Sequence, residues 1–316
     1  MDHSHEGSTT EIITRTLLYL GVFAQVGVGF FARWIGPELA QNRRALRMVL
    51  PFGGALLAVG SSLYLAYHIV WMLGGPTREV YLSYLTQTQQ GNLLLARVLL
   101  VVALLGNELG PAARRNQPLD KVVFSLTALA LLATLTLTAH AGARGGVALL
   151  SHLVHTAAVV AWGGSLLALG LLWNGRPETL AAVERLSRLG GVAVILFVLS
   201  GSLLALTHLS GFAISPPRAA ANLTASAYGL ALVRKLLGVA AVLGIAAFNR
   251  WWLLPRTRRA WLGRLVRLEA LILLGVLVLT GFLAATSPPP TGLFDGDVGL
   301  VAGLPLDGAA DGRGLR

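Results

Sequence analysis

Long apolar runs, separated by short segments rich in proline, glycine or charge, dominate the chain. Each run reaches the roughly 20 residues that an α-helix needs to cross about 30 Å of hydrocarbon. The eight runs lie near residues 12–36, 46–73, 92–110, 121–141, 147–173, 187–210, 228–250 and 265–286. Lipid offers backbone amides no hydrogen-bond partner, and the runs are too long for barrel strands. The pattern therefore predicts an all-α polytopic membrane protein with about eight transmembrane helices.

The second and sixth runs resemble each other. The nine residues from Gly60 to His68 align with those from Ser200 to His208, so both runs end on a histidine. The third and seventh runs carry Arg97 and Arg234 about one and a half turns from the same end. We therefore expect two pseudo-repeated four-helix halves, as in membrane proteins built from parallel repeats. The halves would span 12–141 and 147–286, between external tails at 1–11 and 287–316.

Composition agrees with a membrane protein. The chain is 55% hydrophobic and only 12% charged, whereas about a quarter of the residues in a soluble domain are charged. Its net charge of +11 does not indicate a nucleic-acid surface, because the basic residues alternate between loops instead of forming one patch. Membrane lipid is therefore the expected surrounding, and no nucleic-acid partner is expected.

The basic residues also predict the orientation. Fifteen fall in one set of loops: Arg43, Arg44, Arg47, Arg114, Arg115, Lys121, Arg176, Arg185, Arg188, Arg250, Arg256, Arg258, Arg259, Arg264 and Arg267. Six fall in the opposite set: Arg15, Arg78, Arg144, Arg218, Arg313 and Arg316. Because cytoplasmic loops carry the excess of Lys and Arg, both termini should lie outside.

All seven histidines are then expected at or near the outer face. Neutral imidazole is the commonest protein metal ligand, and ionisable groups within membranes are functional candidates. The candidate metal ligands are His68, His140, His152, His155 and His208, with His3, His5 and Met72 as further candidates. Imidazole suits copper, zinc, iron or nickel, and the absence of cysteine excludes thiolate ligands. The alternative is that these histidines simply prefer an interface to hydrocarbon.

The same clustering suits haem b, whose iron takes axial histidines from facing helices. The candidates for that cofactor are His68, His140, His155 and His208, with Arg97 and Arg234 pairing with the propionates. The alternative role for the two arginines is to extend toward lipid headgroups.

Other polar residues are expected to be structural. Asn249 and Arg250 would end the seventh run at the inner face, and Glu269 would lie about one turn into the eighth run from that face. A buried contact of Glu269 with either Arg250 or Asn249 is therefore geometrically allowed, and such a pair is expected to fix packing. Lys235 is placed in the same structural group.

Several motifs together resemble a known family. They are His155, Trp162-Gly163-Gly164, Tyr228-Gly229 leading to Lys235, Asn249-Arg250, Leu268-Glu269, Pro288-Pro289, and His140 within Ala139-His140-Ala141. This set resembles the copper-resistance protein D family of bacterial inner-membrane proteins. The likeness is strongest from about residue 150 to 290 and looser in the first half. The chain lacks the methionine-rich outer loops that would be expected of a protein passing on Cu(I), and in this it differs from the family pattern.

The resemblance implies an eight-helix inner-membrane protein associated with periplasmic copper handling, and the distribution of basic residues would then place both termini on the periplasmic side. It implies copper as the ion handled, binding at the outer face, and import or transfer across the membrane. A periplasmic copper-binding protein is the implied partner. The alternative from the residues is a b-type haem protein that relays electrons or reduces a metal at the outer face. Transport or binding is expected in preference to enzymatic catalysis.

Overall fold

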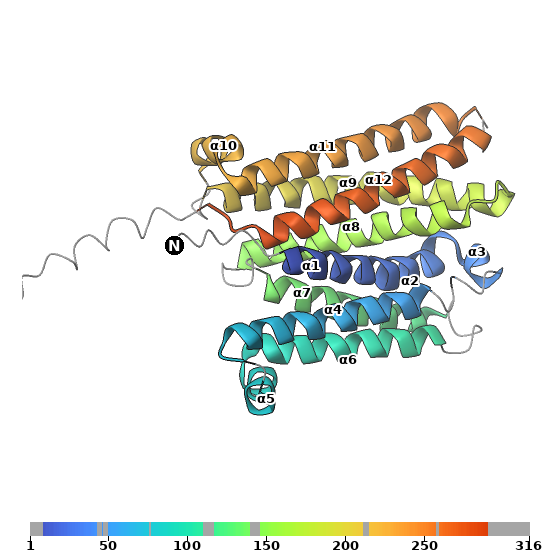
Figure 1. Cartoon of the computed structure of the whole chain (residues 1–316). Helices are drawn as coiled ribbons and strands as arrows, with labels where there is room; N and C mark the ends of the chain where they lie inside the picture. Colours follow the sequence, from blue (N-terminus) through green and yellow to red (C-terminus); the bar gives the residue numbers. More distant parts are fainter. Residues whose placement is uncertain are drawn as a thin grey trace, which may run out of the picture.

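The computed structural model describes residues 9–42, 46, 50–75, 77–109, 117–139, 146–210, 215–256 and 259–289. Within these ranges the regular structure is helical and contains no strand. Eight helices are long and apolar enough to cross a membrane, which confirms the predicted architecture (Figure 1). They run over Thr9–Ile35, Leu50–Trp71, Gln89–Leu109, Pro118–Thr138, Gly146–Leu172, Pro177–Leu209, Ala227–Leu253 and Ala260–Ala285.

Two of the spans contain π-helical segments, labelled η. The first span joins α1 (Thr9–Val22), η1 (Phe23–Gly27), α2 (Val28–Phe30) and η2 (Phe31–Ile35). The seventh joins α11 (Ala227–Phe248) and η6 (Asn249–Leu253). The other spans are α4 (Leu50–Met72), α6 (Gln89–Leu109), α7 (Pro118–Thr138), α8 (Gly146–Leu172), α9 (Pro177–Leu209) and α12 (Arg259–Ala285). Short helices α3 (Pro37–Asn42), α5 (Arg78–Gln87) and α10 (Pro216–Ala225) lie between spans.

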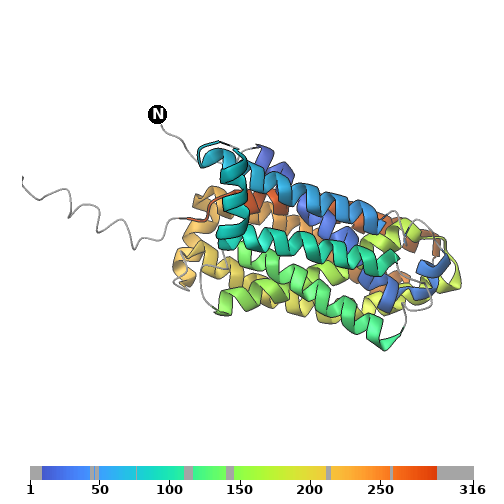
Figure 2. The ribbon, with the colours of Figure 1, turned by 90° about the horizontal axis from the view of Figure 1, so that it is seen from below.

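The bundle has two chemically different ends. Helices α5 and α10 lie at the same end, near the start of the first span (Figures 1 and 2). We call this the histidine end, because four described histidines lie on the spans near it: His68, His152, His155 and His208. The opposite arginine end carries most of the described basic residues, including Lys121, Arg176, Arg185, Arg188, Arg250, Arg256, Arg264 and Arg267. The asymmetry in charge that the sequence predicts between loops is thus an asymmetry between the two ends.

Helix α9 is longer than its apolar run. The sequence predicts a start near residue 187, whereas the helix begins at Pro177, which occupies the first turn. Proline is favoured there because its missing N–H would be unpaired in any case. The first turns bury Thr179 and Ala182, and Arg185 pairs with Glu38 of α3 at 2.9 Å. These contacts keep a polar segment helical at the arginine end, where hydropathy alone predicts a loop.

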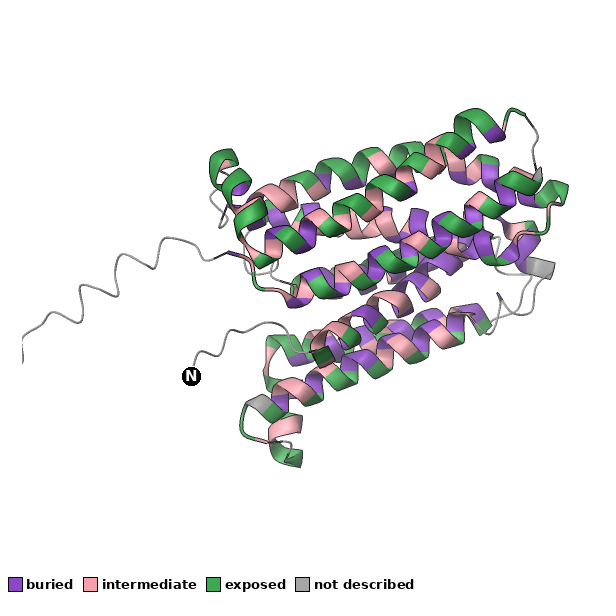
Figure 3. Ribbon diagram, turned by 45° about the horizontal axis from the view of Figure 1, so that its top comes forward, coloured by how far each residue is buried: buried purple, intermediate pink, exposed green. Residues whose placement is uncertain are grey.

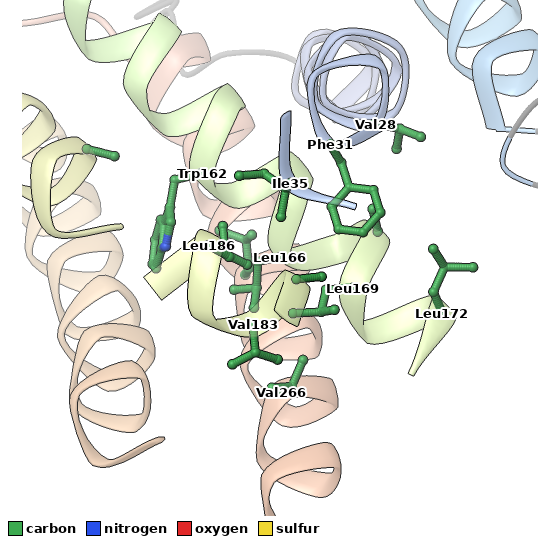
Figure 4. Packing of buried hydrophobic residues seen from close by; sticks show 14 of the residues in the cluster. Val28, Phe31, Ile35, Trp162, Leu166, Leu169, Leu172, Val183, Leu186 and Val266 are labelled. Atoms are coloured by element: carbon green, nitrogen blue, oxygen red, sulfur yellow. The ribbon is translucent and has the colours of Figure 1, made fainter. Parts of the chain in front are cut away.

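Apolar side chains occupy both the interior and the outer surface. Figure 3 shows buried residues along the inward faces of the helices and exposed residues along the outward faces. Inside, Leu166 and Leu169 of α8 pack against Val183 and Leu186 of α9 (Figure 4). Outside, large residues such as Leu237 remain exposed. An apolar outer surface is expected for helices that face lipid.

The two halves meet at a close helix crossing. A Cβ added to Gly27 would lie 2.5 Å from the Cα of Gly164, and one added to Gly164 would collide with Gly27 in turn. Glycine is therefore required at both positions, since the obstacle is backbone that cannot rotate away. Such small-residue contacts allow transmembrane helices to approach closely.

Helices α6 and α11 begin in the same way. The Thr88 hydroxyl accepts a hydrogen bond from Gly91 N at 3.0 Å, and the Ser226 hydroxyl accepts one from Gly229 N at 2.9 Å. A Cβ on either glycine would collide with a carbonyl of the preceding short helix, α5 or α10. This correspondence adds to the sequence likeness between the halves. The duplication itself stays a prediction.

Candidate functional site

His155, on α8, is held by a backbone carbonyl of α9. Its Nδ1 lies 2.9 Å from the carbonyl oxygen of Phe197. A carbonyl oxygen can only accept, so Nδ1 carries the hydrogen and the lone pair of the neutral ring lies on Nε2. Gly201 provides the space for the ring, because an added Cβ would lie 2.9 Å from His155 Cε1. The ring is therefore fixed in both orientation and tautomer.

His152 lies three residues before His155 and faces α7. Its Nδ1 is 3.0 Å from the hydroxyl of Thr136, which itself donates to Leu132 O at 3.1 Å. The hydroxyl of Thr156 lies 3.5 Å from the same nitrogen, so Nδ1 lies between two hydroxyl groups that do not fix the tautomer of this ring.

His208 lies near the C-terminal end of α9 and is only 8% exposed. Its Nδ1 donates to Leu204 O, 2.7 Å away on the same helix, so its lone pair also lies on Nε2. The ring stacks on Tyr228 of α11, with centroids 6.0 Å apart and planes 7° from parallel. The tyrosine thus positions His208 between the sixth and seventh spans.

The ammonium group of Lys235 lies near two of these histidines. His152 lies within electrostatic range of both His208 and Lys235, and His155 within range of His152 and Lys235. Lys235 extends from α11, is partly buried, and has no hydrogen-bond partner among the described residues. Three imidazoles and an amine from three helices are therefore near enough to influence one another's charge at the histidine end, although the described ones do not form a set that could hold one ion.

The two arginines proposed as a matched pair differ. Arg97 is 2% exposed and donates to Thr134 O at 3.0 Å and to Thr138 Oγ1 at 2.6 Å, both on α7. Arg234 is exposed. Counting from the matched glycines Gly91 and Gly229, the sixth residue onward is Arg97 in one half and Lys235 in the other. This register aligns Arg97 with Lys235, whereas the sequence likeness aligned it with Arg234, and the register that relates the two halves stays a prediction.

Tyr84 of α5 lies beside Arg97. Burial raises the pKa of its phenol, and the charge of Arg97 opposes that shift. Its hydroxyl has no partner among the described residues. The described hydrogen-bond partners of Arg97 are thus threonine oxygens, and no carboxylate among the described residues pairs with it.

The structure does not place the other candidate ligands beside His152, His155 and His208. His68 lies on α4, in the other half, and is partly buried. Within the described ranges, no three side chains of the His, Asp and Glu types come close enough to hold one metal ion. His3, His5 and His140 lie outside the described residues, as does the side chain of Met72. The gathered candidates are therefore His152, His155 and His208.

A buried ion network at the arginine end was not predicted from the sequence. Arg33, 1% exposed, donates to Glu108 of α6 and pairs with Asp120 of α7 at 3.0 Å. Its guanidinium also lies 4.2 Å from the ring centroid of Phe124. The network joins the first, third and fourth spans. Its signal in the sequence is the presence of Arg33 and Glu108 inside apolar runs, where a charge needs a partner.

Of the two contacts that the sequence leaves open for Glu269, the structure shows the one with Asn249, whereas Arg250 donates to Ser187 O. Asn249 Nδ2 lies 2.6 Å from Glu269 Oε1, and both side chains are buried. This pair links η6 to α12 near the arginine end, far along the helices from the histidines.

Comparisons with known proteins agree with the sequence resemblance. The family model described as "Copper resistance protein D-like, N-terminal domain" matches residues 7–150, and the one described as "Copper resistance protein D" matches residues 180–283. A curated relative, "Copper resistance protein D" from Pseudomonas syringae pv. tomato, is 29% identical over 275 residues. That match covers 79% of this chain and 84% of the relative. No solved structure gives a significant match.

Proposed function

Because the chain belongs to the copper resistance protein D family, we propose that it binds copper through histidines at the histidine end and transfers the ion into or across the bacterial inner membrane. Copper is here the cargo. The proposed ligands are His152, His155 and His208, which lie near the same end of the bundle but, among the described residues, do not form one set close enough to hold a single ion together. His68, His140, His3, His5 and Met72 remain further candidates for capture at the same end.

The orientation of His155 and His208 is the observation that carries this proposal. Each ring gives its Nδ1 hydrogen to a backbone carbonyl, which turns the Nε2 lone pair away from that carbonyl. Metal-binding histidines are typically held in this manner, because the outer hydrogen bond fixes the tautomer and raises ligand basicity. Imidazole nitrogen suits copper, and the chain has no thiolate that would compete for it.

We further propose that the histidine end faces the periplasm. The excess of basic residues at the opposite end supports this orientation. Reporter fusions after Arg115 and after Arg259 should give a cytoplasmic signal. A periplasmic signal at either position would reverse the proposed orientation. The expected partner is then a periplasmic copper-binding protein that delivers or accepts the ion.

Metal analysis of the purified protein tests the binding step. We expect bound copper in the unmodified protein and in Ser165→Ala, a variant of the same helix that leaves every histidine intact. We expect its loss in the double variant His155→Ala/His208→Ala. Undiminished copper in a folded double variant would refute the assignment, and copper uptake into proteoliposomes then tests transfer.

The same preparation tests haem b as the alternative. A Soret band in the spectrum of the unmodified protein that is missing when His155 is substituted would favour haem over copper. The arginines proposed for its propionates give this alternative little support, because Arg97 is engaged with threonines and Arg234 is exposed.

A further inference from the structure

A cavity of about 340 Å³ lies in the second half of the bundle, toward the arginine end. It is bounded by α8, α9, α11, η6 and α12, and apolar side chains form most of its wall. Its volume falls within the range of roughly 300–1,000 Å³ that is usual for ligand pockets. The cavity is separate from the histidines, because its lining comes from the opposite ends of the same helices.

A polar pair is buried in this apolar wall. Glu269 is 4% exposed and Asn249 6% exposed, and they hydrogen-bond to each other at 2.6 Å. With Asn249 Nδ2 donating to the carboxylate, Asn249 Oδ1 is buried without a partner. Reversing the amide would leave the NH₂ unpartnered instead. In either arrangement one strong hydrogen-bonding group faces the cavity unsatisfied, which is costly unless something small occupies the space beside it.

The local backbone is arranged to leave this space open. Asn249 begins the π-helical segment η6, and π-helical interruptions frequently occur at functional sites. Small residues line the facing helices, with Gly190 and Gly191 on α9 and Ala246 on α11. A Cβ on Gly190 would lie 3.0 Å from Trp162 Nε1, so even a methyl group would crowd the wall.

The charges around Glu269 do not neutralise it. Arg250 of η6 is the one basic residue in the cavity lining, and its guanidinium donates to Ser187 O of α9. The lining residues from α8, α9 and α11 carry no charge. Arg267, on α12 itself, donates to Trp173 O at 3.3 Å. Among the described residues, Asn249 is therefore the hydrogen-bond partner of Glu269, and no cation pairs with it.

We propose that Glu269 is a proton-binding site, reached through the cavity from the arginine end. A carboxylate with one amide neighbour in an apolar wall requires either a cation or a proton. The described side chains of the lining offer one carboxylate, one amide oxygen and the hydroxyl of Ser187, whereas a hard metal cation takes about six or more oxygen ligands. A proton needs only one oxygen. It passes from hydronium in the cavity to a carboxylate oxygen, leaving a water molecule and a neutral carboxylic acid.

This site goes beyond the copper proposal and does not depend on it. In a protein that moves a cation inward through the second half, release of the proton from Glu269 would leave a carboxylate whose negative charge offsets the cation near the arginine end. The histidines and Glu269 would then act at opposite ends of one half.

Labelling with dicyclohexylcarbodiimide tests the proposal in the full-length protein in lipid vesicles, without copper. The reagent is apolar, reacts with protonated carboxylic acids and stays attached whole, so peptide mass spectrometry locates it. We expect Glu269 to be labelled on the order of tenfold more than Glu108 or Asp120, which corresponds to about one pKa unit of difference in protonation. Those two carboxylates are matched controls, since both are buried and both are paired with Arg33.

Two further results are required. Labelling at Glu269 should fall as the pH rises, and the infrared band of a protonated carboxylic acid should fall with it and be missing in Glu269→Gln. Labelling should also fall several-fold in Ala246→Leu, which fills the cavity but keeps the carboxyl group. Equal labelling of all three carboxyls, or labelling unaffected by pH, would overturn the proton site. Unchanged labelling in Ala246→Leu would overturn the route through the cavity.

Discussion

Gly201→Ala should weaken copper binding although Gly201 has no side chain to offer a ligand. The new Cβ would lie 2.9 Å from His155 Cε1 and 3.0 Å from its Nδ1, whereas ordinary contact begins at 3.4 Å. The ring must therefore move by about 0.5 Å, the difference between these distances. The hydrogen bond from Nδ1 to Phe197 O, now 2.9 Å, would lengthen or be lost.

The size of the effect follows from that hydrogen bond. Removing the outer hydrogen bond of a metal-binding histidine typically lowers metal affinity by roughly 10–100-fold. Here the ring is displaced but retained, so we expect a loss of roughly tenfold, at the lower end of that range. Crowding should also destabilise the fold by about 1–3 kcal/mol. Copper titration against a competing chelator measures the affinity, and a melting curve in the same detergent measures the stability.

Gly60→Ala is the control, because no atom lies within 4 Å of its added Cβ. It adds the same methyl group to a membrane-spanning helix, so it should leave both quantities nearly unchanged. If Gly201→Ala binds copper as tightly as the unmodified protein while its melting temperature falls, the methyl group disturbs packing but His155 is not a ligand. That outcome would refute the reasoning.

Four other substitutions follow from the structure. Arg33→Leu leaves two buried carboxylates without their cation and should lower the stability of the fold by about 3–5 kcal/mol in denaturant titrations. Gly27→Leu places a side chain against backbone at the crossing of the halves and should reduce folded yield more than Gly60→Ala. The hydrogen bond from Arg185 holds the pKa of Glu38 below its ordinary value, so its stabilisation is present above the unfolded-state pKa and disappears as the pH falls through the folded-state pKa. Because that pair is exposed, Glu38→Gln should lose less than about 1 kcal/mol at neutral pH and nothing in acid. Lys235→Met should tighten copper binding by removing a positive charge beside the histidines, whereas Lys235→Arg should not.

The eight spans could be predicted because hydrocarbon leaves a chain few choices. Any apolar run of sufficient length must be helical there, whatever it packs against. The ends were harder to predict, since α9 begins ten residues before its predicted start, at Pro177 and not at 187. Its first turns are polar, and contacts with α3 that are distant in sequence keep them helical. Hydropathy measures partition into lipid and contains no information about such contacts.

The candidate site was predicted only in part. The sequence predicted the histidines at the outer face because helices alternate in direction. In the structure His68, His152, His155 and His208 lie near one end of the bundle, and the side that this end faces stays a prediction. It could not show that Gly201 makes room for His155, since that depends on which face of α9 meets α8. The network around Arg33 was missed for a similar reason. Its three charges lie on three helices, and each one alone resembles an isolated interfacial residue.

The two predicted halves each have a short helix between their second and third spans, α5 and α10, but they differ in how their interiors are closed. At the central crossing, the residue two positions before each glycine is Gln25 in the first half and Trp162 in the second. Gln25 is fully buried, and its amide nitrogen Nε2 donates to Val101 O of α6 at 2.8 Å. This hydrogen bond joins the first and third spans. Trp162 makes no such bond that the structure describes and lines the cavity instead.

The neighbouring helices follow the same division. In the first half α4 packs along α6, whereas in the second half α9 and α11 touch little. The first half is further closed by the network around Arg33, which uses its buried charges on one another. In the second half, the ionisable side chains of His155, Lys235 and Glu269 form no ion pair among the described residues. Substitutions of buried polar groups should therefore act mainly on stability in the first half and mainly on binding in the second, as expected if one copy of a duplicated unit became the scaffold for the other.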